Sequence, residues 1–110
     1  MKRALITGIT GFAGSHLADH LVSKNKYSVF GTYLLDQGVS NLDKVKNEVK
    51  ISKINLMFPE ECNVLVGRIK PDLVFHLAAL PSPANSFKDP QKTLTNNIIA
   101  EVNILNAIKT

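Results

Sequence analysis

A glycine-rich turn near the amino terminus constrains the possible folds of this chain more than any other feature. The stretch LITGITGFAG places Gly8, Gly11 and Gly14 at three-residue intervals directly after an apolar run. Glycine loses more conformational freedom on folding than any other residue, so glycines at fixed spacing indicate a backbone path that side chains would block. Residues 3–7 are typical of a short buried strand and residues 15–24 of an amphipathic helix, so the glycines form the turn between them.

The rest of the chain continues to alternate strands with helices. β-branched and aromatic residues predict a second strand over 27–34, and 49–56 fits a third, with a loop between them that holds at most a short helix around 41–47. The near-continuous apolar run 72–80 is typical of a fourth strand, buried on both faces of a parallel sheet. Because crossovers between parallel strands are right-handed, this order predicts one α/β domain over 1–110 with an open, doubly wound parallel sheet.

Two further helices complete the pattern. Pro59 suits the first turn of a helix that ends before Pro71. The predicted apolar stripe of that helix consists of Val64, Leu65 and Ile69. From about residue 91 a long amphipathic helix is predicted, with an apolar side made by Leu94, Ile98, Val102, Leu105 and Ile108. The sequence stops inside this helix, and a doubly wound sheet of four strands would have an uncovered edge, so we expect the amino-terminal portion of a longer protein.

Composition narrows the functional classes. The chain has 110 residues, of which 45% are hydrophobic, and no apolar run approaches the roughly 20 residues that a membrane span requires. No segment is typical of a signal peptide, and the single cysteine, Cys62, fits a reducing cytoplasm and a small residue on a helix. The formal net charge is +4, but Glu48 interrupts the lysines within 44–53 and no aromatic residue is interleaved. We therefore expect neither nucleic acid nor a membrane as a partner.

A glycine turn at this place in a doubly wound sheet is typical of a phosphate site. Backbone N–H groups and the positive end of the helix face the anion, and the absent side chains let a pyrophosphate approach closely. We assign Gly8 to the tight turn, Gly11 to the close approach and Gly14 to the packing of helix on strand. A Walker-type phosphate loop is disfavoured because no Gly-Lys-Ser/Thr follows the glycines. The alternative is a helix start that merely tolerates glycine.

Four segments together resemble one family. The turn Thr7-Gly8-x-x-Gly11-Phe12-x-Gly14 resembles the TGxxGxxG turn of the extended short-chain dehydrogenase/reductase family, the epimerases and dehydratases of nucleotide sugars. The segments PDLVFHLAAL, SFKDP and NNIIAEVNILNAIK resemble that family's fourth strand, the loop after it and the asparagine-led helix that follows. Within the family, the wording is most similar to that of GDP-mannose 4,6-dehydratases and GDP-4-keto-6-deoxymannose reductases.

The resemblance implies a Rossmann-like, NAD(P)-binding domain whose cofactor lies on the glycine turn. Carried over residue by residue, it places Gly8, Phe12 and Ala13 on the cofactor pyrophosphate. It places Ala78 and Ala79 near the ribose on the nicotinamide side and the adenosine. The full set of implied cofactor-binding residues is Gly8, Gly11, Phe12, Ala13, Gly14, Tyr33, Asn55, Leu56, Ala78, Ala79, Ser86 and Asn97.

Two positions depart from the usual cofactor pattern. At the end of the second strand, where a dinucleotide-binding fold has an acidic residue for the ribose of NAD, this chain has Tyr33, and Asp36 follows in the loop. The absence of a fixed carboxylate removes repulsion of a 2′-phosphate, which favours NADP over NAD. Asn55 stands where the family usually has an aspartate that contacts adenine, and an amide can still hydrogen-bond there.

The remaining polar candidates receive modest roles. The resemblance places Ser86 near the cofactor phosphates, and Asn97 either holds the helix that lines the active site or caps its start. We interpret His76 as a hydrogen-bonded strand residue, because no orienting partner for catalysis is evident. His16 and His20 share one helix face, but no third ligand suggests itself, so we expect a solvated face and no metal site.

The catalytic part of the resemblance is missing from these residues. The family transfers a hydride at a sugar carbon and uses a tyrosine whose pKa is lowered by a lysine four residues on. Here Gly31 stands four residues after Tyr27, and Gln37 four after Tyr33. We therefore expect the cofactor-binding part of a cytoplasmic nucleotide-sugar epimerase, dehydratase or reductase, inactive by itself. Its complete form would bind a nucleotide-diphosphate sugar, and a homodimer is compatible. The alternative is a non-catalytic Rossmann-like module that senses a dinucleotide or serves as a scaffold.

Overall fold

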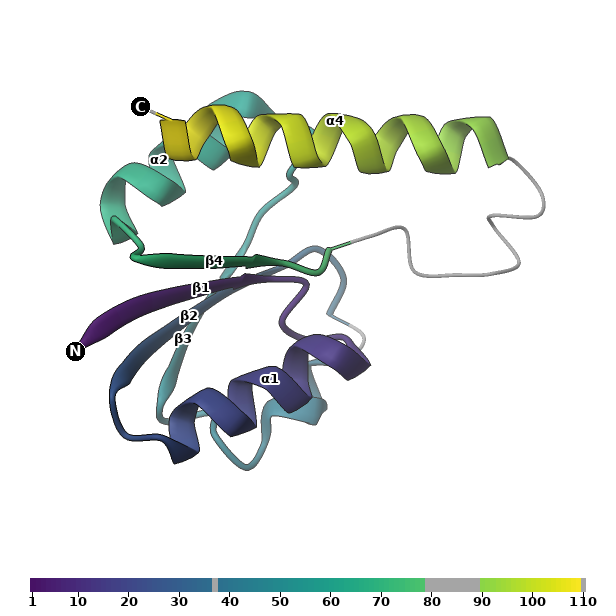
Figure 1. Ribbon diagram of the computed structural model, residues 1–110. Helices are drawn as coiled ribbons and strands as arrows, with labels where there is room; N and C mark the ends of the chain where they lie inside the picture. The colour runs from purple at the N-terminus through teal and green to yellow at the C-terminus, as the bar shows by residue number, and fades with distance from the viewer. Residues whose placement is uncertain (37, 79–89, 110) are drawn as a thin grey trace.

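The computed structural model describes residues 1–36, 38–78 and 90–109. Their helices and strands follow in the order β1 (Lys2–Thr7), α1 (Phe12–Ser23), β2 (Tyr27–Tyr33), the 3-10 helix η1 (Val39–Leu42), β3 (Val49–Lys53), α2 (Pro59–Ile69), β4 (Leu73–His76) and α4 (Pro90–Lys109). The strands form one parallel sheet in the order β3-β2-β1-β4. α1 and η1 cover one face of the sheet, and α2 and α4 cover the other (Figure 1). This is the predicted α/β, doubly wound arrangement.

The strand order creates a topological switch point beside β1. The chain moves from β1 through β2 to β3 in one direction and then returns to the opposite side of β1 with β4. The carboxyl ends are in register, because Thr7 pairs with Thr32 of β2 and with His76 of β4. Ligands of open α/β sheets bind outside the carboxyl ends of the strands at such a point. The glycine turn follows β1 at this place.

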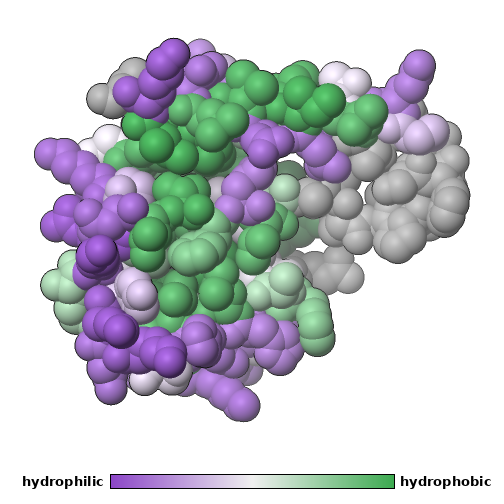
Figure 2. Space-filling view, in the orientation of Figure 1, coloured by the Kyte–Doolittle hydropathy of each residue, from purple (hydrophilic) through white to green (hydrophobic). Residues whose placement is uncertain are grey.

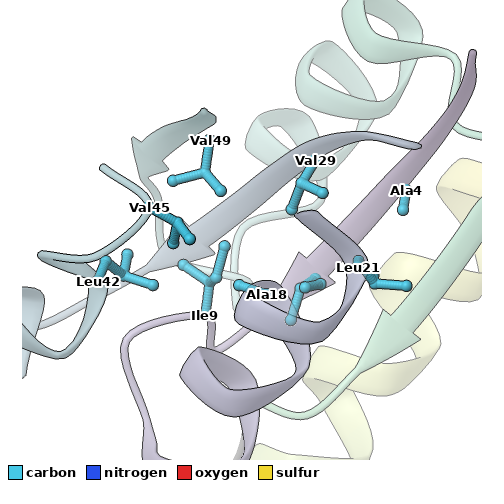
Figure 3. Packing of buried hydrophobic residues seen from close by; sticks show 9 residues of the cluster. Ala4, Ile9, Ala18, Leu21, Val29, Leu42, Val45 and Val49 are labelled. Carbon is cyan, nitrogen blue, oxygen red and sulfur yellow. The ribbon is translucent and has the colours of Figure 1, made fainter. Parts of the chain in front are cut away.

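Two apolar layers hold the helices to the sheet. The layer under α1 consists of Ala4, Ile6, Ile9, Ala18, Leu21, Val29, Leu42, Val45 and Val49 (Figure 3). On the opposite face, Leu5 packs with Leu65 of α2 and Ile104 of α4. Successive residues of β1 thus serve opposite layers, as the alternation of side chains along a strand requires. A Cβ on Gly31 would overlap the side chain of Ile9, so β2 carries a glycine where Ile9 crosses it.

The predicted elements are confirmed, with shifts of a few residues at their ends. α1 begins at Phe12 rather than at residue 15. The short helix between β2 and β3 is a 3-10 helix that ends at Leu42. β3 ends at Lys53 rather than at residue 56, because the chain turns at Asn55, whose side-chain oxygen accepts a hydrogen bond of 2.9 Å from the backbone N–H of Met57.

The expectations about the buried faces of β4 and α2 are wrong. The residues of β4 are half-buried rather than buried on both sides, because β1 is the only neighbour of β4 among the strands described. The predicted strand over 72–80 is described as a strand only over Leu73–His76, and residues 79 and 80 lie outside the described residues. On α2, Val64 is 67% exposed, because the helix turns a different set of side chains toward the sheet. These are Cys62, Leu65, Val66 and Ile69.

α4 turns its small residues, not its predicted apolar side, toward the core. Its buried residues are Ala100, Asn103, Ile104 and Ala107. The alanines let the helix approach α2 closely, and Nδ2 of Asn103 donates a buried hydrogen bond of 2.8 Å to the carbonyl of Leu56. The predicted side is exposed at Leu94, Ile98, Val102, Leu105 and Ile108. In Figure 2 a green, apolar band follows α4 along the top of the molecule.

Candidate functional site

A cavity of about 600 Å³ opens where β1, β2 and β4 end. Its lining comes from the glycine turn, the end of β2, the segments that follow β3 and β4, and the first half of α4. No charged side chain lines it among the described residues. Cofactor pockets commonly enclose roughly 300–1,000 Å³, with mostly apolar walls and a few polar groups. The cavity is therefore large enough for much of a dinucleotide.

The glycine turn is shaped by close backbone approaches. Gly8 has φ +70°, and a Cβ there would lie 2.9 Å from Cα and N of Ala78. A Cβ on Gly14 would overlap the carbonyl oxygen of Gly8. The backbone N–H of Gly11 donates to that same oxygen at 3.1 Å, which closes the turn. The tight turn at Gly8 and the helix packing at Gly14 are thus visible in the geometry.

Gly11 has a different role in this geometry. It is the N-cap of α1 with extended backbone, φ −72° and ψ 174°, and a Cβ there would lie 3.4 Å from the carbonyl oxygen of Gly8. Beyond its chain neighbours, no other atom of the described residues lies within 4 Å of that Cβ. No side chain caps the helix, and the first turn of α1 contains no acidic residue. The first N–H groups of a helix have no partner within the helix. Those of Phe12, Ala13 and Gly14 therefore line the cavity without a carboxylate to compete with an anion.

The cavity brings together all but two of the predicted cofactor-binding residues. Those that line it are Gly8, Gly11, Phe12, Ala13, Gly14, Tyr33, Asn55, Leu56, Ala78 and Asn97. Ala79 and Ser86 lie outside the described residues. Sequence reasoning missed Leu34, Leu35, Ile54 and Met57, which form apolar walls beside Tyr33 and Asn55. Their position directly after strand ends is the signal that could have found them, because parallel strands end at one edge.

The carboxylate of Asp36, which follows the end of β2, pairs with a lysine and does not line the cavity. Nζ of Lys53 donates a hydrogen bond of 3.2 Å to Oδ1 of Asp36, and the two groups form an ion pair. Both side chains are exposed to solvent. Asp36 does not line the cavity, whereas Tyr33, Leu34 and Leu35 do. The described residues of the wall at the end of β2 therefore present no negative charge to a ligand.

Asn55 is held by the chain around it. Its side-chain oxygen accepts from the N–H of Met57, and its own N–H donates to Oε1 of Glu61 at 3.3 Å. The Met57 N–H uses one of the two lone pairs of the oxygen, so Asn55 can offer a ligand its side-chain NH₂ as well as the remaining lone pair. An aspartate in this position would offer only acceptors, so the amide adds a donor to this wall.

The hydroxyl of Thr7 links β1 to the end of β4. Oγ1 lies 2.7 Å from Nδ1 of His76, and it accepts backbone N–H bonds from Leu77 at 3.0 Å and Ala78 at 3.1 Å. Sequence reasoning identified no partner for His76, because this one lies 69 residues earlier in the chain. Burial lowers the pKa of His76 below its ordinary value, and the negative charge of Glu101 opposes that effect.

The remaining reactive side chains lie away from the cavity. Cys62 is fully buried, its Sγ donates to the carbonyl of Leu56 at 3.6 Å, and burial with the nearby charge of Glu61 raises the pKa of the thiol. A thiol held in its protonated form is a poor nucleophile. His16 is exposed on α1, where its ring meets Phe12 edge-on at 4.5 Å between centroids. In the described part of the chain, no three His, Cys, Asp or Glu side chains are grouped to hold a metal, and no helix combines the length and apolarity of a membrane crossing.

The sequence profile of the GDP-mannose 4,6-dehydratase family matches residues 5–110. The chain belongs to this family. Among similar proteins, the GDP-mannose 4,6-dehydratase of Yersinia enterocolitica is 31% identical over 117 aligned positions, which cover 99% of this chain and 32% of the relative. The family thus accounts for the glycine turn, the strand order and the long helix together, and the fold class predicted from the sequence is confirmed.

Two solved structures share the fold over nearly the whole chain. A UDP-glucose 4-epimerase from Thermotoga maritima, solved with UDP-glucose, is 32% identical with a TM-score of 0.83, and the match covers 96% of this chain and 33% of that one. The UDP-glucose 4-epimerase of Thermus thermophilus, solved with NAD, is 29% identical with a TM-score of 0.83, over 96% and 33% of the respective chains. The present chain spans about a third of the length of these relatives.

Proposed function

We propose that residues 1–110 form the dinucleotide-binding part of an NAD(P)-dependent enzyme that acts on a nucleotide-diphosphate sugar as an epimerase, a dehydratase or a reductase. The observation that carries the proposal is the uncapped amino-terminal turn of α1, which opens with the glycine turn onto an uncharged cavity at the switch point of the sheet. Support comes from the family and from a similar epimerase solved with NAD.

The residues present fit such a cofactor. The N–H groups of Phe12, Ala13 and Gly14 and the positive end of α1 suit a pyrophosphate, since no carboxylate stands in the first turn. Tyr33 and the apolar wall after β2 would flank the adenosine, and Asn55 would donate to a ring nitrogen. When bound, a nicotinamide cofactor supplies the hydride acceptor or donor for a sugar carbon. The chain's own residues bind it, orient it and exclude water from it.

For cofactor preference we propose NADP over NAD. Among the described residues no carboxylate lines the wall at the end of β2, and Asp36 is paired with Lys53 outside the cavity, so none of these residues repels a 2′-phosphate. We also propose that this segment binds without turnover, since neither Tyr27 nor Tyr33 is followed by a lysine four residues on. A cytoplasmic location accords with a single cysteine that is buried and unpaired.

We further propose that the complete protein is a homodimer that pairs through α4. This helix is apolar on both sides, which is typical of a helix buried in an assembly. Its outer side exposes Leu94, Ile98, Ile99, Val102, Leu105 and Ile108 over 20 residues, a length of about 30 Å. A two-fold axis would place identical apolar faces against each other, which makes one such face self-complementary.

Calorimetric titration with NADP and NAD tests the cofactor proposal. We expect saturable binding that is lost in Gly11→Val, because the new side chain would occupy the approach to the helix N–H groups while meeting little of the protein itself. The matched control is Gly67→Val on the exposed side of α2, where a Cβ meets nothing within 4 Å. Absence of binding in the unsubstituted protein, or equal binding by Gly11→Val and the control, would refute the pyrophosphate site.

A further inference from the structure

The hydroxyl of Thr7 has three hydrogen-bond partners, so it must act both as a donor and as an acceptor. A hydroxyl offers one hydrogen and two lone pairs. The backbone N–H groups of Leu77 and Ala78 can only donate, and both point at Oγ1, at 3.0 and 3.1 Å. The N–H of Leu77 is shared, because it also donates to the carbonyl oxygen of Thr7 at 3.2 Å. They use the two lone pairs. The single hydroxyl hydrogen is then left for the third partner, Nδ1 of His76, at 2.7 Å.

This arrangement favours one protonation state of His76. With two backbone N–H donors on Oγ1, the hydroxyl hydrogen of Thr7 is directed at Nδ1, and the proton of the neutral ring then lies on Nε2. A charged imidazole would bring a third donor to a hydroxyl that has two lone pairs. One of the two N–H bonds to Oγ1 would then have to break, and only the N–H of Leu77 would keep a second acceptor among the described residues, the carbonyl oxygen of Thr7.

The N–H bonds from Leu77 and Ala78 to Oγ1 of Thr7 hold one wall of the proposed cofactor cavity. Leu77 and Ala78 both line it. Ala78 also lies against the glycine turn, since a Cβ on Gly8 would come within 2.9 Å of its backbone. The hydroxyl of Thr7 therefore holds the end of β4 beside the phosphate turn, together with the backbone bond from Leu77 to the carbonyl oxygen of Thr7. The hydrogen-bonding state of that hydroxyl depends on His76.

We propose that His76 is a positioning residue for dinucleotide binding, which in its neutral Nε2–H form acts through Thr7 to hold Leu77 and Ala78 against the glycine turn. The inference rests on the proposed function of the cavity. His76 does not line the cavity, so its effect passes through the hydroxyl and the backbone rather than through contact with the ligand.

Because His76 can be protonated, dinucleotide affinity should depend on pH. On β1, His76 faces the uncharged Thr7, and on α4 the charge of Glu101 reaches it and favours protonation. Burial acts in the opposite sense and lowers the pKa of His76, so the neutral form persists below the ordinary value near 6.5. Dinucleotide affinity should therefore be constant at neutral pH and fall on further acidification.

Nitrogen NMR of the histidine side chains tests the hydrogen-bond pattern without any cofactor. We expect His76, assigned by its loss in His76→Asn, to show an unprotonated Nδ1 and a protonated Nε2 at neutral pH. A protonated Nδ1 would overturn the proposal. This readout is independent of the proposed function, so it remains decisive even if the protein binds no dinucleotide.

The second readout is the affinity for NAD measured between about pH 8 and about pH 5. We expect the dissociation constant of the unsubstituted protein to rise on acidification, and His76→Asn, whose Oδ1 can accept from Thr7 but does not titrate, to lose that rise. His20→Asn, an exposed histidine on α1, is the matched control and should keep it. Thr7→Val should weaken binding roughly ten-fold at every pH, because the N–H of Ala78 loses its acceptor and that of Leu77 keeps only the carbonyl oxygen of residue 7, and Thr7→Ser should restore it. An identical pH profile in the unsubstituted protein and His76→Asn, or full affinity in Thr7→Val, would overturn the positioning role.

Discussion

Replacement of Gly8 by alanine tests whether the turn after β1 has the described geometry. At φ +70° a residue with a Cβ is destabilised by about 1–2 kcal/mol. The new Cβ would also lie 2.9 Å from Cα and N of Ala78, closer than ordinary contacts, and the resulting shift of packed backbone costs about 1–3 kcal/mol. Gly8→Ala should therefore lower the free energy of unfolding by about 2–5 kcal/mol, a large part of the roughly 5–15 kcal/mol typical of a domain.

Urea unfolding followed by circular dichroism measures this loss. With a slope of about 1–3 kcal/mol per molar urea, the midpoint should fall by on the order of 1 M or more. Gly67→Ala on α2 is the control: its Cβ meets nothing within 4 Å, and alanine is the better helix former by about 1 kcal/mol, so it should raise the midpoint. A midpoint for Gly8→Ala equal to that of the unsubstituted protein would show that the turn is not built as described.

Three further outcomes are expected. Asn103→Leu should destabilise the fold by about 1–3 kcal/mol in the same urea assay, because the buried carbonyl of Leu56 loses its donor; no loss would show that this bond is not formed. Stability should fall as pH drops through about 6.5, because His76 binds a proton in the unfolded chain before the folded one does, and His76→Asn should reduce this slope; equal slopes in both proteins would contradict the lowered pKa. Val102→Glu should dissociate the proposed homodimer in analytical ultracentrifugation, whereas a sedimentation profile unchanged by the charge would place the partner surface elsewhere.

The sequence predicts those parts of the fold whose signal is local. The spacing of Gly8, Gly11 and Gly14 reports a backbone path directly, and the geometry at Gly8 and Gly14 agrees with it. The strand and helix order follows from short apolar runs, each separated from the next by residues that turn the chain. Ten of the nineteen described residues that line the cavity were predicted, and they came from the resemblance to a family whose motifs follow the strand ends.

The orientation of α4 could not be predicted, because the helix is apolar on two sides. Hydropathy favours the side with the larger residues, such as Leu94 and Leu105, yet the core side is made by Ala100 and Ala107. Those alanines carry a weak hydrophobic signal, but they permit close packing on α2, and the amide of Asn103 finds a buried acceptor there. Close packing in three dimensions decided the face, and no pattern within the helix reports it.

The pairing of Thr7 with His76 was beyond sequence reasoning for a related cause. Each residue is unremarkable within its own strand, and 69 positions separate them. They meet because β4 pairs with β1 in a register that sets these two residues opposite each other at the carboxyl edge. Only a known register would have revealed the contact.

The most direct test of the cofactor site is an NMR titration of the protein with NAD, in which each backbone amide is followed separately. We expect saturable shifts that are largest for the N–H groups of Phe12, Ala13 and Gly14, with smaller shifts at Ala78 across the turn. Such a result would place the pyrophosphate on the amino-terminal turn of α1. Shifts that leave these amides unchanged at saturation, or no saturable shifts with NAD or NADP, would contradict a dinucleotide site built on the glycine turn.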